Sequence, residues 1–291
     1  MRIDAIQLWS AAERGEDGVV TVPAYRFITF GLGYSDHTNP FIIEDASGLD
    51  MEDIIPQFVG GFYEDGVTDH YFDMLPKERL IALKLQLNPN FQAGLLVADL
   101  RDTLYRMISY SRTSLLEVRF MYQGTQVANV RGQLVKVESP QFTETPKALL
   151  NIACPFPLLR GPNYIQLAPD LEAPTPTLVD EQSTAPHGFR MKLTFIEDHH
   201  STLNLKGKYG STTWDFKIDK WFNEGDELYF SSERDNLYLY MIRPGDPRKD
   251  HSDKTLMNQV WPIMFPGETQ LWVTNDVTID SLTYRPHYWG V

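Results

Sequence analysis

The side chains with the clearest capacity for chemistry are carboxylates gathered in one stretch of the chain, residues 36–75. The stretch contains ten acidic residues and no Lys or Arg. The acidic residues are Asp36, Glu44, Asp45, Asp50, Glu52, Asp53, Glu64, Asp65, Asp69 and Asp73. Such a run can be a solvated loop, a site that holds cations, or a surface that repels a polyanion. Its spacing does not match the twelve-residue calcium loop with its central Gly and terminal Glu, so we predict no metal ion or other cofactor.

The histidine and cysteine residues give no support for catalysis. His199 and His200 are adjacent, and neighbouring residues on a strand point to opposite faces, so we interpret the pair as a polar loop end. Cys154, the single cysteine, stands in an apolar run and is expected to be a buried, unreactive thiol. The sequence has no Gly-x-Ser-x-Gly elbow, P-loop or dinucleotide-binding glycine pattern, so we predict that the protein is not an enzyme.

Aromatic residues in the second half could contact a sugar. Trp214 alternates with Phe216 and Ile218, which predicts a place in the core. The pair Tyr238 and Tyr240 is a further candidate, but Trp221, which stands beside a charged turn, is the better candidate for an exposed carbohydrate contact.

Composition and charge limit the class of protein. The chain has 291 residues, 42% hydrophobic and 22% charged, which is an ordinary globular composition for two domains or one large β domain. Apolar runs are far too short for a membrane span, and the N-terminus lacks the apolar core of a signal peptide. The net charge of −13 argues against a nucleic-acid grip, which needs clustered Lys and Arg, but not against a surface that repels DNA.

The first half reads as strands with one helix. Alternation from Ile81 to Leu87 predicts a strand, and residues 115–122, 127–138 and 148–154 predict three more. Residues 91–110 predict a helix whose apolar face is Leu96, Leu100, Leu104, Met107 and Ile108. Residues 31–78, rich in glycine and acidic residues, predict long loops or an extended hairpin.

The second half reads as strands only. A proline-rich stretch at residues 168–188 indicates a boundary, and beyond it short alternating strands are separated by turn signals about every ten residues. We therefore predict a mainly β protein with a barrel-like domain at 1–165, which carries the inserted helix, and a β-sandwich or jelly roll at 166–291.

Three segments together resemble the distal tail protein family of long-tailed, non-contractile phages. They are the strand–helix–strand passage at 79–118, the close of the first half at 147–157 (KALLNIACPFP), and the C-terminal region at 261–291, which ends in RPHYWGV. The resemblance lies in the order of the pieces and the two-part layout. Residues 36–75 depart from the family pattern, and we interpret them as an inter-subunit arm or as the wall of a DNA channel.

The resemblance implies a structural protein of the virion tail tip, made in the bacterial host cytoplasm. The first domain would form a ring, by expectation a homo-hexamer, and the second would be a galectin-like sandwich on its outside. The ring would join the tail tube protein to the tail-tip hub and carry tail fibres or receptor-binding proteins. DNA would touch it only in transit through the lumen. Two alternatives stay open, namely a carbohydrate-binding module for host attachment and a tail hydrolase.

Overall fold

The computed structural model describes residues 2–10, 13–14, 20–22, 24, 26–32, 39–50, 57–58, 72–73, 78–111, 114–140, 146–167, 177–233, 236–251, 261–273 and 277–290. The chain divides into two compact units. Unit 1 comprises Met1–Pro162 and Trp289–Val291, and unit 2 comprises Asn163–Tyr288. The second unit is therefore inserted in the sequence of the first. The predicted boundary at 165/166 lies close to this one at 162/163, but the prediction places residues 289–291 in the second domain.

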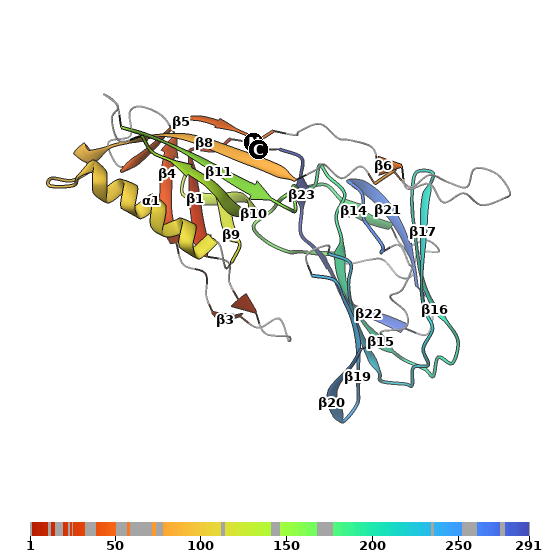
Figure 1. The fold of residues 1–291 in the computed structure, drawn as a ribbon. Coiled ribbons are helices and arrows are strands. Elements are labelled where there is room, and N and C mark those ends of the chain that lie inside the picture. The colour runs from red at the N-terminus through yellow and green to blue at the C-terminus, as the bar shows by residue number, and fades with distance from the viewer. Residues whose placement is uncertain are drawn as a thin grey trace. The chain divides into compact units, whose positions relative to one another are not determined.

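Unit 1 is built on a closed barrel of seven strands (Figure 1). In spatial order they are β11 (Lys147–Cys154), β8 (Arg79–Leu87), β5 (Phe41–Ser47), β4 (Arg26–Leu32), β1 (Ala5–Ser10), β9 (Leu116–Tyr122) and β10 (Thr125–Glu138). Pairing of β10 with β11 closes the barrel. All pairs are antiparallel except β4 with β5. Closure gives each of the seven strands a neighbour on both sides, although β4 and β5 pair only at Gly31 with Ile42 and at Leu32 with Ile43.

Alternating side chains make the barrel core. In β8, Ile81, Leu83, Leu85 and Leu87 are buried and the residues between them face outward, which confirms the predicted strand. The hairpin between β9 and β10 turns at Gln123 and Gly124, which both have positive φ, 50° and 76°. Two consecutive residues of this kind form the tight turn whose twist suits a two-residue hairpin.

Strand β5 lies in the stretch where the sequence predicted long loops or an extended hairpin. Its residues Phe41, Ile42 and Ile43 are all buried, so the alternating pattern is missing at its start. A register shift between Ile43 and Asp45 against β8 breaks the pattern again. A strand with one parallel neighbour and a bulge gives no period-2 signal, so alternation in the sequence did not predict β5.

Helix α1 (Val97–Ser111) packs its buried residues Leu100, Leu104 and Met107 toward the barrel, beside β10. Leu96 precedes the helix and is 62% exposed, so its predicted place on the apolar face is wrong. The Leu96 N–H instead donates to Asp99 Oδ2 at 2.9 Å. This contact satisfies a free amide at the start of the helix and ties the carboxylate to that end.

The remaining elements of unit 1 are short. They are β2 (Glu13–Arg14), β3 (Val20–Val22), β6 (Gln57–Phe58), β7 (Phe72–Asp73), β12 (Leu159–Arg160) and the 3-10 helix η1 (Pro89–Phe91). Strands β2 and β3 pair with each other, as do β6 and β7, so these are two small hairpins outside the barrel sheet.

Unit 2 is a β-sandwich of two antiparallel sheets. The six-stranded sheet runs β13 (Ile165–Leu167), β22 (Val277–Tyr284), β15 (Phe189–Phe195), β18 (Glu227–Ser231), β19 (Tyr238–Arg243) and β20 (Asp246–His251). The four-stranded sheet runs β14 (Thr177–Asp180), β21 (Gly267–Trp272), β16 (Leu203–Tyr209) and β17 (Thr212–Ile218). A further short strand is β23 (His287–Tyr288). Inward residues of both sheets share one core, so the predicted mainly β fold with a sandwich is confirmed.

Trp214 is part of that core, as its alternation predicted. Its side chain faces Gly207 on the neighbouring strand, where an added Cβ would come within 2.2 Å of the indole. The indole Nε1 donates to the Ile263 carbonyl at 3.1 Å. A residue without a side chain is thus required at position 207, because the indole ring occupies the space of a Cβ.

Candidate functional site

Three members of the acidic set have described side chains. Glu44 lies in β5, its side chain is 8% exposed, and it pairs with Lys147 Nζ at 2.9 Å and with Lys84 Nζ at 3.9 Å. Asp45 and Asp50 are exposed. The charge of Glu44 is therefore compensated by lysines of β11 and β8, which are far away in sequence.

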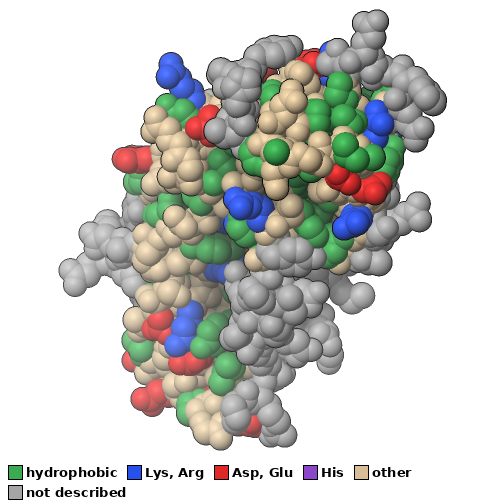
Figure 2. Space-filling view, turned by 90° about the vertical axis from the view of Figure 1, so that its left-hand side faces the viewer, with side chains coloured by type: hydrophobic (Ala, Val, Ile, Leu, Met, Phe, Trp, Pro, Cys, Tyr) green, Lys and Arg blue, Asp and Glu red, His purple; other side chains and the backbone are tan. Residues whose placement is uncertain are grey.

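The side chains of the other seven acidic residues lie outside the described part of the structure. Asp73 belongs to β7, and only its backbone is described. Asp36, Glu52, Asp53, Glu64, Asp65 and Asp69 lie outside the described residues. The lumen or arm predicted from the whole set stays a prediction. On the face of the molecule in Figure 2, acidic and basic side chains are interspersed rather than segregated.

Arg79 of unit 1 makes several hydrogen bonds to backbone carbonyl groups. It is 3% exposed, at the start of β8. Its Nε donates to the Pro157 carbonyl at 2.6 Å and its Nη1 to the Gly48 carbonyl at 2.8 Å. Its Nη2 donates to the Trp289 carbonyl at 2.5 Å. One guanidinium thus joins three segments that are distant in sequence, including the returning C-terminal residues. This role is structural.

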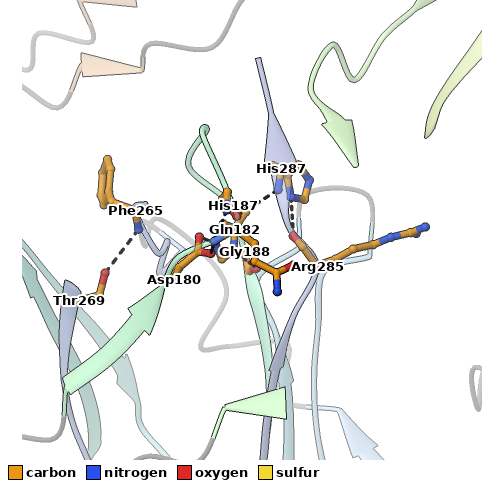
Figure 3. Close-up of polar contacts among 9 residues, drawn as sticks. Asp180, Gln182, His187, Gly188, Phe265, Thr269, Arg285 and His287 are labelled. Atoms are coloured by element: carbon orange, nitrogen blue, oxygen red, sulfur yellow. Dashed lines mark hydrogen bonds and ion pairs between the residues drawn. The ribbon is translucent and has the colours of Figure 1, made fainter. Parts of the chain in front are cut away.

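A buried polar cluster in unit 2 has the residue types of a catalytic triad (Figure 3). His187 Nε2 lies 2.8 Å from Asp180 Oδ2, and both side chains are fully buried. Asp180 Oδ1 accepts the amide hydrogens of Gln182 and Ser183, each at 3.0 Å. The His187 ring also stacks on Tyr284 with centroids 4.7 Å apart.

The geometry of this cluster does not suit catalysis. His187 Nδ1 is held at 2.9 Å from the Gly188 carbonyl, so both ring nitrogens have protein partners. Burial alone would raise the pKa of Asp180, but hydrogen bonds from His187, Ser183 and Tyr284 outweigh it and hold that pKa well below its usual range. A base must reach the proton that it abstracts, and neither the His187 nor the Asp180 side chain reaches solvent. The cluster instead fixes the 180–188 turn against β22. The sequence did not indicate this cluster, although Asp is a common turn residue because its side chain accepts the backbone N–H two residues on, as Asp180 does from Gln182.

The two adjacent histidines are separated as expected. His199 is 5% exposed and its backbone pairs with Phe222, while the His200 ring lies 5.4 Å from the ring of Trp221. Among the described residues, no group of three or more His, Cys, Asp or Glu side chains is placed to hold a metal ion.

The remaining single-residue predictions concern Cys154 and Trp221. Cys154 is fully buried, and burial raises the pKa of its thiol to about 12. The structure thus confirms a buried thiol that stays protonated at neutral pH. Trp221 is 70% exposed, as its neighbourhood in the sequence indicated. Its carbohydrate contact stays a prediction.

The part of the chain that the structure describes has no helix long and apolar enough to cross a membrane.

Comparison with known proteins gives a fold and no sequence relative. No family model matches the sequence, and no curated protein is similar to it. The structure is similar to the crystal structure of the Dit protein of phage SPP1, described as a paradigm of the hub adsorption apparatus in phages that infect Gram-positive bacteria. The TM-score is 0.53 at 17% identity, over 86% of this chain and 96% of that chain. A weaker match is the phage P2 baseplate in its activated conformation with calcium, with a TM-score of 0.47 at 7% identity over 98% of each chain. The chain therefore has the fold of the SPP1 Dit protein, which confirms at the level of fold the resemblance seen in its sequence.

Proposed function

We propose that this protein is a structural component of a phage tail tip that assembles as a ring and joins the tail tube to the tail-tip hub. The observation that carries the proposal is the fold likeness to the SPP1 Dit protein, which spans a barrel followed by a sandwich over 86% of the chain. The order of sequence segments supports the same function independently of the structure.

Each unit has a role in this proposal. Unit 1 forms the ring, by expectation a hexamer, and unit 2 carries tail fibres or receptor-binding proteins outside it. DNA passes through the lumen without stable binding. The protein would be made in the bacterial host cytoplasm and reside in the virion tail tip.

The closed barrel limits how such a ring can form. Because each of the seven strands has a neighbouring strand on both sides, we expect subunits to meet mainly through outward side chains or through the small hairpins β2–β3 and β6–β7. Two outward apolar side chains lie on strands that flank β11, namely Leu80 of β8 at 44% exposure and Val135 of β10 at 57%. Apolar side chains of this kind suit a buried contact between copies.

Native mass spectrometry and negative-stain imaging test the ring. We expect a closed oligomer of the full chain, alone or with the tail proteins that flank it. The double variant Leu80→Glu and Val135→Glu should shift the population toward monomer, because each charge would have to be buried in the contact. Val179→Glu, at a side chain of unit 2 that is 44% exposed, is the matched control and should assemble normally. A chain that stays monomeric at every concentration, alone and with tail partners, would contradict the proposal.

The proposal includes no catalytic activity. It is supported by the buried triad-like cluster, in which both histidine nitrogens are occupied. Cleavage of purified cell-wall or capsule material by the protein would overturn this part and favour a tail hydrolase.

A further inference from the structure

The outward face of the six-stranded sheet in unit 2 carries an unusual set of side chains. Strand alternation turns Leu239 and Met241 of β19 into the core and Tyr238 and Tyr240 outward. We define the tyrosine face as Tyr164, Arg190, Lys192, Tyr229, Tyr238 and Tyr240. Registers place Lys192 opposite Tyr229, and Tyr229 opposite Tyr240, so these three form one row across β15, β18 and β19. Five of the six residues lie in strands of the same sheet, and Tyr164 directly precedes β13.

The rings on this face support one another. Tyr229 and Tyr240 stack with centroids 4.9 Å apart at 11°, and Tyr238 lies 5.5 Å from Tyr240. The Arg190 guanidinium lies 4.3 Å from the centre of the Tyr164 ring, and Lys192 Nζ lies 5.6 Å from that of Tyr229. Aromatic and cation–π contacts of this type fix the rings before any ligand arrives.

Charges on the face are paired within it. Glu233 accepts from Arg190 Nε at 2.7 Å and from the Tyr164 hydroxyl at 3.0 Å. Lys192 Nζ lies 2.7 Å from Glu227 and 3.2 Å from Asp280. The Tyr229 hydroxyl donates to Glu227 at 2.8 Å. The polar groups are held in fixed directions, and the cations on the face are offset by carboxylates.

One polar atom beneath the face has no hydrogen-bond partner. Glu233 is 5% exposed, and its Oε1 is buried without a donor, while Oε2 receives both the arginine and the tyrosine. An unpaired buried carboxylate oxygen is costly, and an ordered water is the donor small enough to satisfy it at this depth.

We propose that the tyrosine face binds a neutral saccharide. A charged ligand would gain little, because the cations and carboxylates of the face already neutralise one another. A neutral ligand with many hydroxyls gains hydrogen bonds to the fixed arginine, lysine and carboxylate groups, and its C–H surface packs on the tyrosine rings. Since the groups are already ordered, binding costs little conformational entropy. The inference does not depend on ring formation.

Trp221 offers a competing site with less support. Its ring is more exposed, but the ring contact that accompanies it is with His200 alone among the described side chains, and no set of fixed donors and acceptors surrounds it. A sugar gains most of its specificity from such polar groups, so the tyrosine face is the better candidate.

A panel of neutral glycans tests the proposal with the full-length chain. An array that contains neutral and anionic glycans would identify a ligand, and titration calorimetry with chitohexaose and maltohexaose would measure affinity. We expect millimolar or tighter binding to at least one neutral glycan. Tyr240→Ala and Arg190→Ala should each weaken it by roughly tenfold, equivalent to ~1.4 kcal/mol. Tyr209→Ala, at a tyrosine of the four-stranded sheet that is 36% exposed, is the matched control and should bind as the parent does.

Several outcomes would overturn the proposal. They are no neutral glycan bound at millimolar concentration, binding of anionic glycans alone, or binding lost in Trp221→Ala and kept in Tyr240→Ala. If the tyrosine variants leave glycan binding intact but prevent binding of a purified tail fibre protein, the face is a protein interface instead. Tyr240→Phe keeps the stacked ring, so loss of binding in Tyr240→Ala but not in Tyr240→Phe excludes misfolding as the cause.

Discussion

Asp180 shows how a buried carboxylate can stabilise a fold instead of catalysing a reaction. It receives two backbone amides and lies against His187 with no solvent exposure of either side chain. A network that is fully satisfied and buried fixes one arrangement of the chain, because any alternative would leave these groups unpaired. The same residue types at the surface would have suggested a reactive site.

Asp180 should make unit 2 sensitive to acid. Its pKa is held below the unfolded value of about 3.9, so its contribution is complete above pH ~4 and is lost as the pH falls toward the folded pKa. We expect the free energy of unfolding to decrease from pH 5 to pH 2, measured by urea titration. Asp180→Asn should lower it by about 1–3 kcal/mol at pH 7 and flatten the decrease. Glu227→Gln, at a more exposed carboxylate, is the comparison, and an equal effect of both variants would contradict this role.

Cys154 should resist modification in the folded protein. The thiolate is the reactive form, and the pKa of about 12 leaves almost none at pH 8. We expect iodoacetamide to label it slowly in buffer and quickly in denaturing urea, followed by mass spectrometry of the intact chain. Rapid labelling in buffer would show that β11 opens readily at its C-terminal end.

At the scale of elements, Arg79 connects segments of unit 1 that are distant in sequence, through hydrogen bonds from one buried guanidinium. The turn after β5, the segment after β11 and the C-terminal Trp289 present backbone carbonyl groups to this side chain. One buried guanidinium satisfies these carbonyls together. Because a guanidinium has five N–H donors in a rigid fork, lysine could not replace it.

Arg79→Met should therefore destabilise unit 1. Removal of hydrogen bonds to a buried charged group costs roughly 1.5–3 kcal/mol, and the carbonyls left behind add to this. Arg101→Met is a suitable comparison, because Arg101 bonds to Ser139 Oγ and the Pro140 carbonyl at the surface and should matter less. Hydrogen exchange in β8 and β5 measures the effect, and unchanged protection in Arg79→Met would show that the guanidinium is dispensable.

Prediction from the sequence succeeded for elements whose buried and exposed residues follow the period of a single helix or strand. Strand β8, helix α1 and the alternating strands of unit 2 follow local periodicity, and all were predicted. Strand β5 was not, since its burial and bulge depend on neighbours distant in sequence. The lysine partners of Glu44 were hidden for the same reason, because register across β5, β8 and β11 brings them together. The tyrosine face was only partly visible, as the pair Tyr238 and Tyr240.

At the scale of the whole molecule, the surplus of acidic residues is the property that the ring proposal must explain. Part of the 36–75 set is compensated, as Glu44 shows, while Asp45 and Asp50 are exposed. If exposed carboxylates face a channel, they would keep DNA from adhering to its wall.

Neutralising part of the set tests this. The variant Asp50→Asn, Glu52→Gln and Asp53→Asn should assemble normally and slow genome ejection, because DNA would meet less repulsion along its path. Ejection kinetics of phage carrying the variant, with particle number as the control for assembly, measures this. Unchanged ejection would remove the lumen assignment and leave a solvated arm.

The return of residues 289–291 to unit 1 also has a consequence for how the chain is made. Arg79 is synthesised early, but the Trp289 carbonyl that it binds emerges from the ribosome only after the whole of unit 2. At ordinary translation rates this interval is on the order of ten seconds. Unit 2 can therefore finish folding before residues 289–291 are available to unit 1. Chains released before residue 289 would carry a complete sandwich and a barrel unit that lacks its last segment.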